Sequence, residues 1–179
     1  MKHFKPLSHF LATAVVTLPL LSCGGGGGGG DDSFVGAAIV AISASPTEID
    51  TGDRTLVSTE VIEVNEDGIA LKFRFPTELN YVPASARLLV DNNDEDASPD
   101  VMTDVDDSTF LVFYLSENDF GSNGEGRLEF QLEAQDELSN QEIEVDADVD
   151  DPLIENDEEF DPENPEFGAE DSVIVDVTG

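Results

Sequence analysis

The chain has 179 residues and is strongly acidic, since 41 aspartates and glutamates outnumber seven lysines and arginines and give a formal net charge of −34. This charge excludes nucleic acid as a partner, because phosphate binding requires a basic surface. The single cysteine excludes a framework of intramolecular disulfides, so the folded part must rely on a hydrophobic core.

The first 22 residues have the composition of an export signal. Two lysines precede an apolar run at residues 10–21, and Ser22 is the small residue expected before a cleavage site. Residues 20–23, Leu-Leu-Ser-Cys, resemble the lipobox of bacterial lipoproteins. The resemblance implies that residues 1–22 are removed and that Cys23 becomes a lipidated N-terminus.

A membrane-spanning helix is one alternative for this segment, but the apolar run is shorter than the roughly 20 residues that a span needs, and it contains Pro19. An ordinary secretory signal also fits, except that it gives no reason for a cysteine followed by seven glycines. We assign residues 23–36 to a flexible tether, because glycine-rich segments behave as random coils. In the lipoprotein resemblance, Gly24 rather than an aspartate after the cysteine favours the outer membrane if the bacterium is Gram-negative.

Removal of the signal leaves five basic and 41 acidic residues, a formal charge of −36, and no histidine. Ser-His-Asp and Cys-His catalysis and histidine-ligated zinc are therefore excluded. The remaining lysine, Lys72, alternates with apolar residues in a predicted strand, so we expect a solvated cation that balances acids on neighbouring strands. We expect no enzyme. A carboxylate-based hydrolase is the least favoured hypothesis, because so many carboxylates make a chance pair unavoidable.

Short apolar runs with a period of two residues predict β-strands along the rest of the chain. Residues 69–75 and 128–134 alternate as half-buried strands do, whereas residues 110–115 are apolar on both faces and predict a strand that is covered on both sides. Turn residues at 50–53, 65–68, 121–124 and 139–140 separate the runs. We predict an immunoglobulin-like antiparallel β-sandwich over residues 37–179. It has about eight strands, at residues 38–45, 56–64, 69–75, 87–91, 110–115, 127–134, 143–149 and 173–177.

Two proline-containing stretches resemble a known family. Residues 45–53 read Ser-Pro-Thr-Glu-Ile-Asp-Thr-Gly-Asp, and residues 75–86 read Phe-Pro-Thr-Glu-Leu-Asn-Tyr-Val-Pro-Ala-Ser-Ala. Both are similar to the conserved repeat domain of unknown function of bacterial cell-surface proteins. The resemblance extends over residues 40–177 and implies an immunoglobulin-like sandwich that serves as a stalk, spacer or adhesion module. It supplies no catalytic residues.

Two acidic segments, predicted as loops at residues 91–107 and 150–171, offer the oxygen ligands that calcium prefers. A solvated acidic surface is the leading interpretation of these segments and would suit a saline habitat, and specific calcium sites are the alternative. We expect Leu153, Ile154, Phe160 and Phe167 to pin parts of the second segment to the sandwich. The residues that would bind calcium are Asp91, Asn93, Asp94, Asp96, Asp150, Asp151, Asp157 and Asp161.

The sequence as a whole predicts a lipoprotein of the bacterial cell envelope whose immunoglobulin-like domain is a non-catalytic adhesion, spacer or assembly module. The expected partners are a membrane, held through the lipid, and a protein or glycan ligand. A calcium-stabilised carbohydrate-binding module is the alternative hypothesis.

Overall fold

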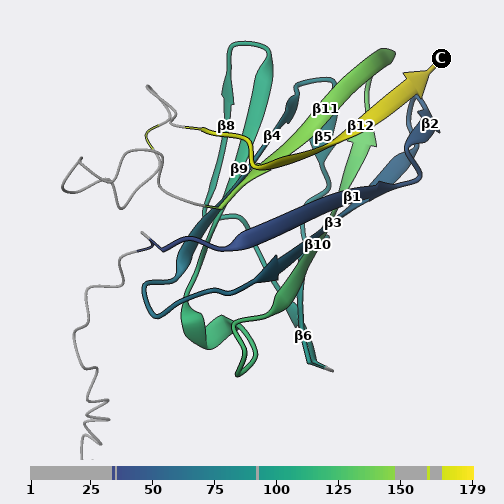
Figure 1. Cartoon of the computed structure of the whole chain (residues 1–179). Helices are drawn as coiled ribbons and strands as arrows, with labels where there is room; N and C mark the ends of the chain where they lie inside the picture. The colour runs from purple at the N-terminus through teal and green to yellow at the C-terminus, as the bar shows by residue number, and fades with distance from the viewer. Residues whose placement is uncertain (1–33, 35, 92, 148–160, 162–166) are drawn as a thin grey trace, which may run out of the picture. The chain divides into compact units, whose positions relative to one another are not determined.

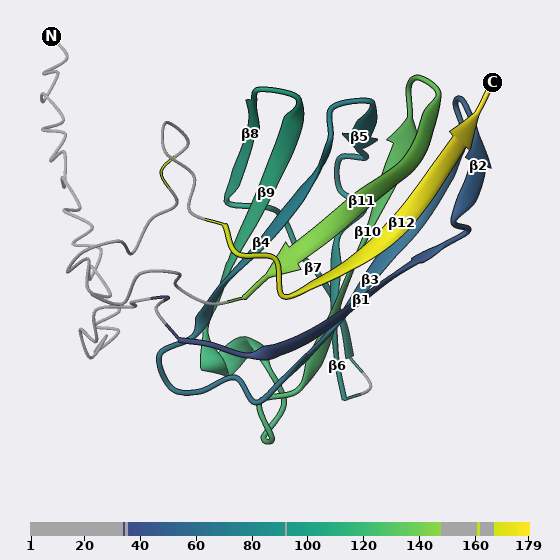
Figure 2. The same ribbon diagram turned by 45° about the horizontal axis from the view of Figure 1, so that its top comes forward.

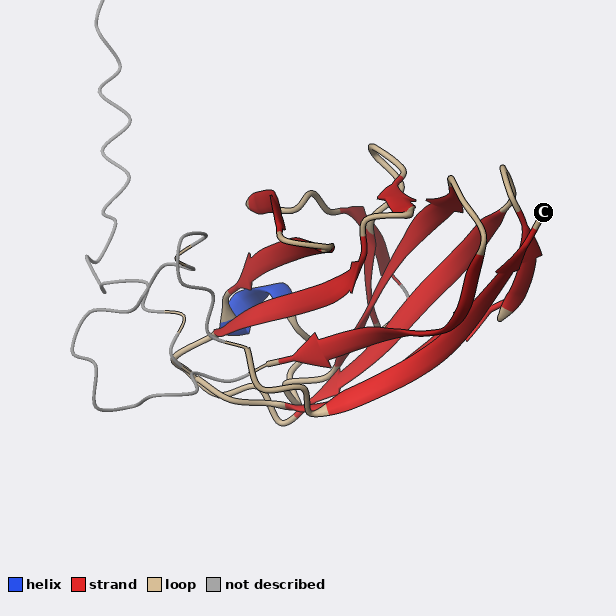
Figure 3. Ribbon diagram, turned by 90° about the horizontal axis from the view of Figure 1, so that it is seen from above, coloured by secondary structure: helices blue, strands red, loops and turns tan. Residues whose placement is uncertain are grey.

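Two β-sheets lie face to face around a hydrophobic core (Figure 1). The structure is a computed structural model that describes residues 34, 36–91, 93–147, 161 and 167–179. The regular structure of these residues consists of twelve strands and one short 3-10 helix, η1 (Glu117–Asp119) (Figure 3). The predicted immunoglobulin-like β-sandwich is therefore confirmed. More strands form than the about eight expected, because short segments also pair at the margins of the sheets.

The first sheet has the order β1-β3-β10-β6-β7, and β5 pairs with the far end of β10. All of its described pairs are antiparallel. Its strands are β1 (Ile39–Ser45), β3 (Arg54–Ile62), β5 (Leu79–Tyr81), β6 (Arg87–Val90), β7 (Asn93–Asp96) and β10 (Gly126–Ala134).

The second sheet has the order β2-β12-β11-β4-β9-β8 (Figure 2). The pairing of β2 with β12 is parallel, whereas the other described pairs of this sheet are antiparallel. Its strands are β2 (Glu48–Asp50), β4 (Ile69–Pro76), β8 (Val101–Val105), β9 (Ser108–Leu115), β11 (Leu138–Asp146) and β12 (Asp171–Thr178).

The core forms from the residues that the alternation predicts. The apolar positions of β4 and β10 are at most 1% exposed, and they face each other across the sandwich with the inner residues of β9 and β11. Phe73 of β4 contacts Phe130 of β10 edge-on, with ring centroids 4.9 Å apart. This aromatic contact joins the two sheets near their centre.

Glycine is required in two of the predicted turns because the backbone there is left-handed. Gly68 has φ of 63° and Gly124 has φ of 66°, a region that favours glycine. A Cβ atom on Gly68 would also lie 2.7 Å from the carbonyl oxygen of Leu115. The predicted turns at residues 65–68 and 121–124 are therefore confirmed.

Three local predictions are wrong. The acidic segment 91–107 is not one loop, since it contains β7 and β8, which pair with β6 and β9 at the margins of the two sheets. The predicted turn at 139–140 lies inside β11, where the pairing with β12 shifts register between Leu138 and Gln141. As a result β11 begins earlier than predicted, at Leu138, and it ends at Asp146 rather than at 149. Asn and Ser indicate irregular backbone, and a bulge satisfies that preference as well as a turn does.

Candidate functional site

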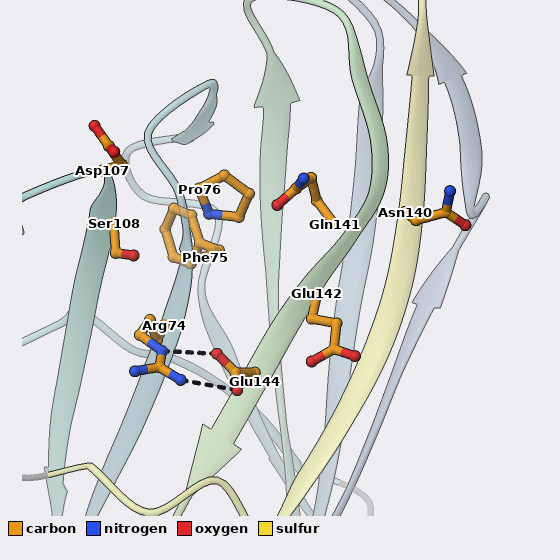
Figure 4. A pocket seen from close by; sticks show the side chains of 9 residues that line it. All are labelled: Arg74, Phe75, Pro76, Asp107, Ser108, Asn140, Gln141, Glu142 and Glu144. Atoms are coloured by element: carbon orange, nitrogen blue, oxygen red, sulfur yellow. Dashed lines mark hydrogen bonds and ion pairs between the residues drawn. The ribbon is translucent and has the colours of Figure 1, made fainter.

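A notch opens between β4 and β11 in the second sheet (Figure 4). The two strands pair only where Lys72, Phe73 and Arg74 oppose residues 144–146. In the same register Pro76 would next oppose Glu142, but that pair does not form. The cavity that results has a volume of about 490 Å³, within the range typical of ligand sites. It is lined by Arg74, Phe75, Pro76, Asp107, Ser108, Asn140, Gln141, Glu142 and Glu144.

The sequence explains why the ladder stops at this level. Residues 106–107 form a two-residue hairpin, which makes Val105 and Ser108 its hydrogen-bonded closing pair. Ser108 therefore directs its N–H and C=O toward β8, and its partner on β4, Pro76, directs its backbone away from β9 and toward β11. Backbone direction alternates along a strand, so Arg74 and Pro76 both face β11 and Phe75 does not. Proline has no N–H to donate, so the ladder between β4 and β11 ends there.

The bulge in β11 widens the opening from the other side. Asn140 has a left-handed backbone with φ of 51°, and its N–H donates to Asp176 Oδ1 at 2.7 Å. Bulges bend a strand and redirect its side chains. Asn140, Gln141 and Glu142 are exposed residues of the lining. In Figure 4 the side chain of Asn140 points across β12, away from β4.

An ion pair between Arg74 and Glu144 forms the floor of the notch. Arg74 Nε lies 2.7 Å from Glu144 Oε2, and Arg74 Nη2 donates to Oε1 at 2.9 Å. The hydrogen bonds that Arg74 donates to Glu144 raise the pKa of Arg74 despite the opposing effect of burial, so this guanidinium stays charged at every physiological pH. The floor is therefore electrically neutral.

The walls of the notch carry the net charge. Glu142 and Asp107 add two carboxylates, while Arg74 is the one basic residue of the lining and is held by Glu144. Ser108, Asn140 and Gln141 add a hydroxyl and two amides that can donate and accept hydrogen bonds. The notch can therefore bind a polar ligand of neutral or positive charge.

Below the notch, the outer face of the second sheet is covered, although an exposed polar face was predicted. Lys72 Nζ lies 2.7 Å from Asp146 Oδ2, and these side chains are only 7% and 0% exposed. Lys72 does lie on the outer face beside a cross-strand acid, as predicted, but the prediction that it is solvated is wrong. Buried charges are costly unless they are paired, so this ion pair is a sensitive part of the structure.

Phe167 covers part of this outer face. Its ring meets Phe110 edge-on with centroids 5.8 Å apart, and the guanidinium of Arg74 lies 4.6 Å from the centre of the same ring. The next residue, Gly168, donates its N–H to Asp146 Oδ2 at 3.0 Å. The predictions that β9 is covered on both faces and that Phe167 packs on the sandwich are both confirmed. The other residues predicted to pin this segment, Leu153, Ile154 and Phe160, lie outside the described residues.

The first group of predicted calcium ligands does not converge in the structure. Asp91 has a left-handed backbone after β6, while Asn93, Asp94 and Asp96 are exposed on β7. Asp94 and Asp96 lie beside Arg87, with 3.7 Å between Asp94 Oδ1 and Arg87 Nε. Within the described ranges, no three acidic, histidine or cysteine side chains are close enough to hold a metal ion.

Of the second group of predicted ligands, Asp150, Asp151 and Asp157 lie outside the described residues, and only Asp161 lies within them. The calcium hypothesis for this group stays a prediction. It is tested by the melting temperature with millimolar calcium and with a chelator. If calcium raises the melting temperature, we expect the double substitution Asp94→Asn and Asp96→Asn to leave that increase unchanged, because these carboxylates face Arg87. Loss of that rise in the variant would place calcium at β7.

Cys23, the signal segment and most of the predicted tether also lie outside the described residues. No helix in the described part of the chain is long and apolar enough to span a membrane. The lipid anchor predicted at Cys23 therefore rests on the sequence alone.

No protein-family model and no curated protein sequence matches the chain. Among solved structures, the T6 backbone pilin of Streptococcus pyogenes is similar at 8% identity and a TM-score of 0.41, over 80% of this chain and 36% of the pilin chain. A non-cellulosomal cohesin from Archaeoglobus fulgidus is similar at 11% identity and a TM-score of 0.38, over 78% of this chain and 91% of the cohesin. A cohesin module from Clostridium perfringens is similar at 8% identity and a TM-score of 0.39, over 80% of this chain and 98% of the cohesin module. The chain thus spans about a third of the pilin, and similarity at this level carries no information on function.

Proposed function

We propose that the protein is a lipid-anchored binding module of the bacterial cell envelope, in which the notch between β4 and β11 receives the ligand. The observation that supports this proposal is the notch itself. It is a cavity of about 490 Å³ lined by unlike polar groups from three strands and a hairpin, and it lies where the ladder of the second sheet is interrupted. Its ligand contributes to adhesion or to the assembly of a larger envelope structure.

The chemistry of the lining supports binding rather than catalysis. The notch contains no histidine, cysteine or lysine, so its acid-base and nucleophilic groups are limited to Asp107, Glu142, Glu144 and Ser108. Glu144 is committed to Arg74 through two hydrogen bonds, and Lys72 is buried against Asp146. A non-catalytic role agrees with these constraints.

A carbohydrate ligand is the second candidate, and the hydroxyl, amide and carboxylate groups of the notch favour it. The lining lacks an aromatic platform, however, because Phe75 is 1% exposed and its side chain belongs to the core. A glycan array probed with the full chain in calcium and in a chelator tests this candidate. Binding that the substitution Glu142→Gln abolishes would establish a glycan site in the notch.

The anchor is tested by replacing Cys23 with serine, which removes the thiol that would carry the lipid. We expect the variant to leave the membrane fraction and to appear in the soluble fraction, because multiple acyl chains are needed for firm attachment. Fractionation followed by detection of the chain measures this shift, with a Ser22→Ala variant as the matched control. A Cys23→Ser protein that still sediments with membranes would contradict the lipoprotein assignment.

A further inference from the structure

We propose that the notch binds a short extended segment of a partner protein that carries basic side chains, and that this segment pairs as a strand between β4 and β11. This inference rests on the proposed function and specifies its ligand. It combines three properties of the notch, namely backbone groups without a partner on the opposite strand, two acidic walls, and a core-facing side that is closed by buried apolar residues.

The backbone groups come from both sides of the opening. The alternation that directs Arg74 and Glu144 toward each other also directs the C=O of Pro76 and the N–H and C=O of Glu142 into the notch. The register gives these groups no partner across the two strands. A strand that enters the notch would donate to both carbonyls and accept from the Glu142 N–H, as in recognition by strand addition.

The side chains define which segment fits. Glu142 and Glu144 alternate with Ile143 along β11, so the acids lie on the outer face, whereas Ile143 is fully buried. On the opposite strand, the side chain of Phe75 also points inward and is 1% exposed. An inserted strand would therefore place basic side chains outward, near Glu142 and Asp107, and only small side chains inward, because the core residues on that side leave little exposed surface.

Electrostatics identify the partner as a different protein. A second copy of this chain would bring a formal charge of −34 and only seven basic residues, so like-charge repulsion opposes self-association at an acidic notch. An anionic ligand is disfavoured as well, because Glu144 already satisfies Arg74, the one cation of the lining. A basic extended segment is the occupant that the charges favour.

The experiment titrates a capped peptide of alternating lysine and valine, six residues long, into the full chain in detergent. Calorimetry gives the affinity, and NMR reports the backbone amide of Glu142. We expect binding that weakens with added salt, together with a shifted and protected Glu142 amide. Two further peptides separate charge from strand pairing. The first has glutamate in place of lysine, and the second has lysines but N-methylated amides on the alternate residues that face the strands.

The glutamate peptide should not bind, and N-methylation should weaken binding about tenfold or more, because carbonyl groups in the notch lose their donors. The double substitution Glu142→Gln and Asp107→Asn should weaken the lysine peptide about threefold to tenfold. The matched control, Asp94→Asn with Glu95→Gln on β7, removes the same charge from exposed residues and should have no effect. Melting temperatures equal to that of the native chain verify that all variants are folded.

Equal binding of the methylated and unmethylated lysine peptides would overturn strand pairing, and equal effects of the two double substitutions would overturn the notch as the site. Absence of peptide binding would overturn the inference as well. The proposed function is tested separately. If the lysine peptide does not bind but a glycan binds and Glu142→Gln abolishes that binding, the inference fails while the notch remains a binding site.

Discussion

Replacing Lys72 with methionine is expected to destabilise the folded protein by about 3–5 kcal/mol, which is the usual cost of removing one partner from a buried ion pair. The substitution keeps the length and apolar stem of the side chain but removes the ammonium that lies 2.7 Å from Asp146 Oδ2. Asp146 is fully buried, so in the variant its carboxylate lacks the counter-charge of Lys72 in surroundings of low polarity, which is costly. Urea unfolding followed by circular dichroism measures the free energy of unfolding.

Two further variants establish that burial causes this loss. Arg54→Met removes an exposed ion pair, in which Arg54 and Glu133 are 52% and 33% exposed, and should cost less than about 1 kcal/mol. The double variant Lys72→Met with Asp146→Leu removes both buried charges and should recover most of the stability lost by Lys72→Met alone. A Lys72→Met protein as stable as Arg54→Met would contradict the structural role of the buried pair.

The ion pair of Lys72 with Asp146 shows that a period-two pattern predicts the face on which a residue lies but not whether that face is buried. Alternation correctly assigns Lys72 to the outer face of β4, opposite an acid of β11. It does not reveal that this face is covered, because the cover comes from residues remote in sequence, such as Phe167. A hint was present in residues 110–115, since Phe110 and Val112 supply apolar side chains to the same outer face. A strand that is apolar on both sides requires a second layer, and any charge beside it shares that burial.

The notch was harder to predict for a related reason. The individual signals are visible in the sequence, as a proline at the end of one strand and a Ser-Asn pair within another. Considered alone, the proline predicts only the end of a strand, and the Ser-Asn pair predicts only a turn. Only the sheet order brings Pro76 and the bulge at Asn140 to the same level of neighbouring strands that are far apart along the chain. Strand order depends on long-range pairing, which local patterns do not specify.

The core, by contrast, could be predicted because it depends on alternation within single strands. Leu128, Phe130 and Leu132 are all fully buried, as their pattern requires. The acidic segment at 91–107 is predicted wrongly because a high density of charge is typical of loops. Charged residues are also common on exposed marginal strands, where they prevent pairing with other molecules. β7, whose four residues are all exposed, fits that description.

Phe130→Ala is expected to have an effect on stability similar to that of Lys72→Met, a loss of about 3–5 kcal/mol. Phe130 is fully buried at the centre of the first sheet, and its ring lies 4.9 Å from that of Phe73, 6.3 Å from that of Phe113 and 6.1 Å from that of Tyr81. The substitution removes the side chain that joins aromatic residues of both sheets and leaves a cavity that a rigid sandwich cannot close.

Phe130→Leu fills most of that cavity and should cost less than half as much, because the price of a core truncation grows with the volume left empty. Ile174→Ala removes a side chain that is 48% exposed and should change the free energy of unfolding by less than about 1 kcal/mol. Urea unfolding of the three variants, with the slope of each transition compared, measures these losses on one scale. If Phe130→Ala were as stable as Ile174→Ala, the two sheets could not be held together by the aromatic contacts that this structure places between them.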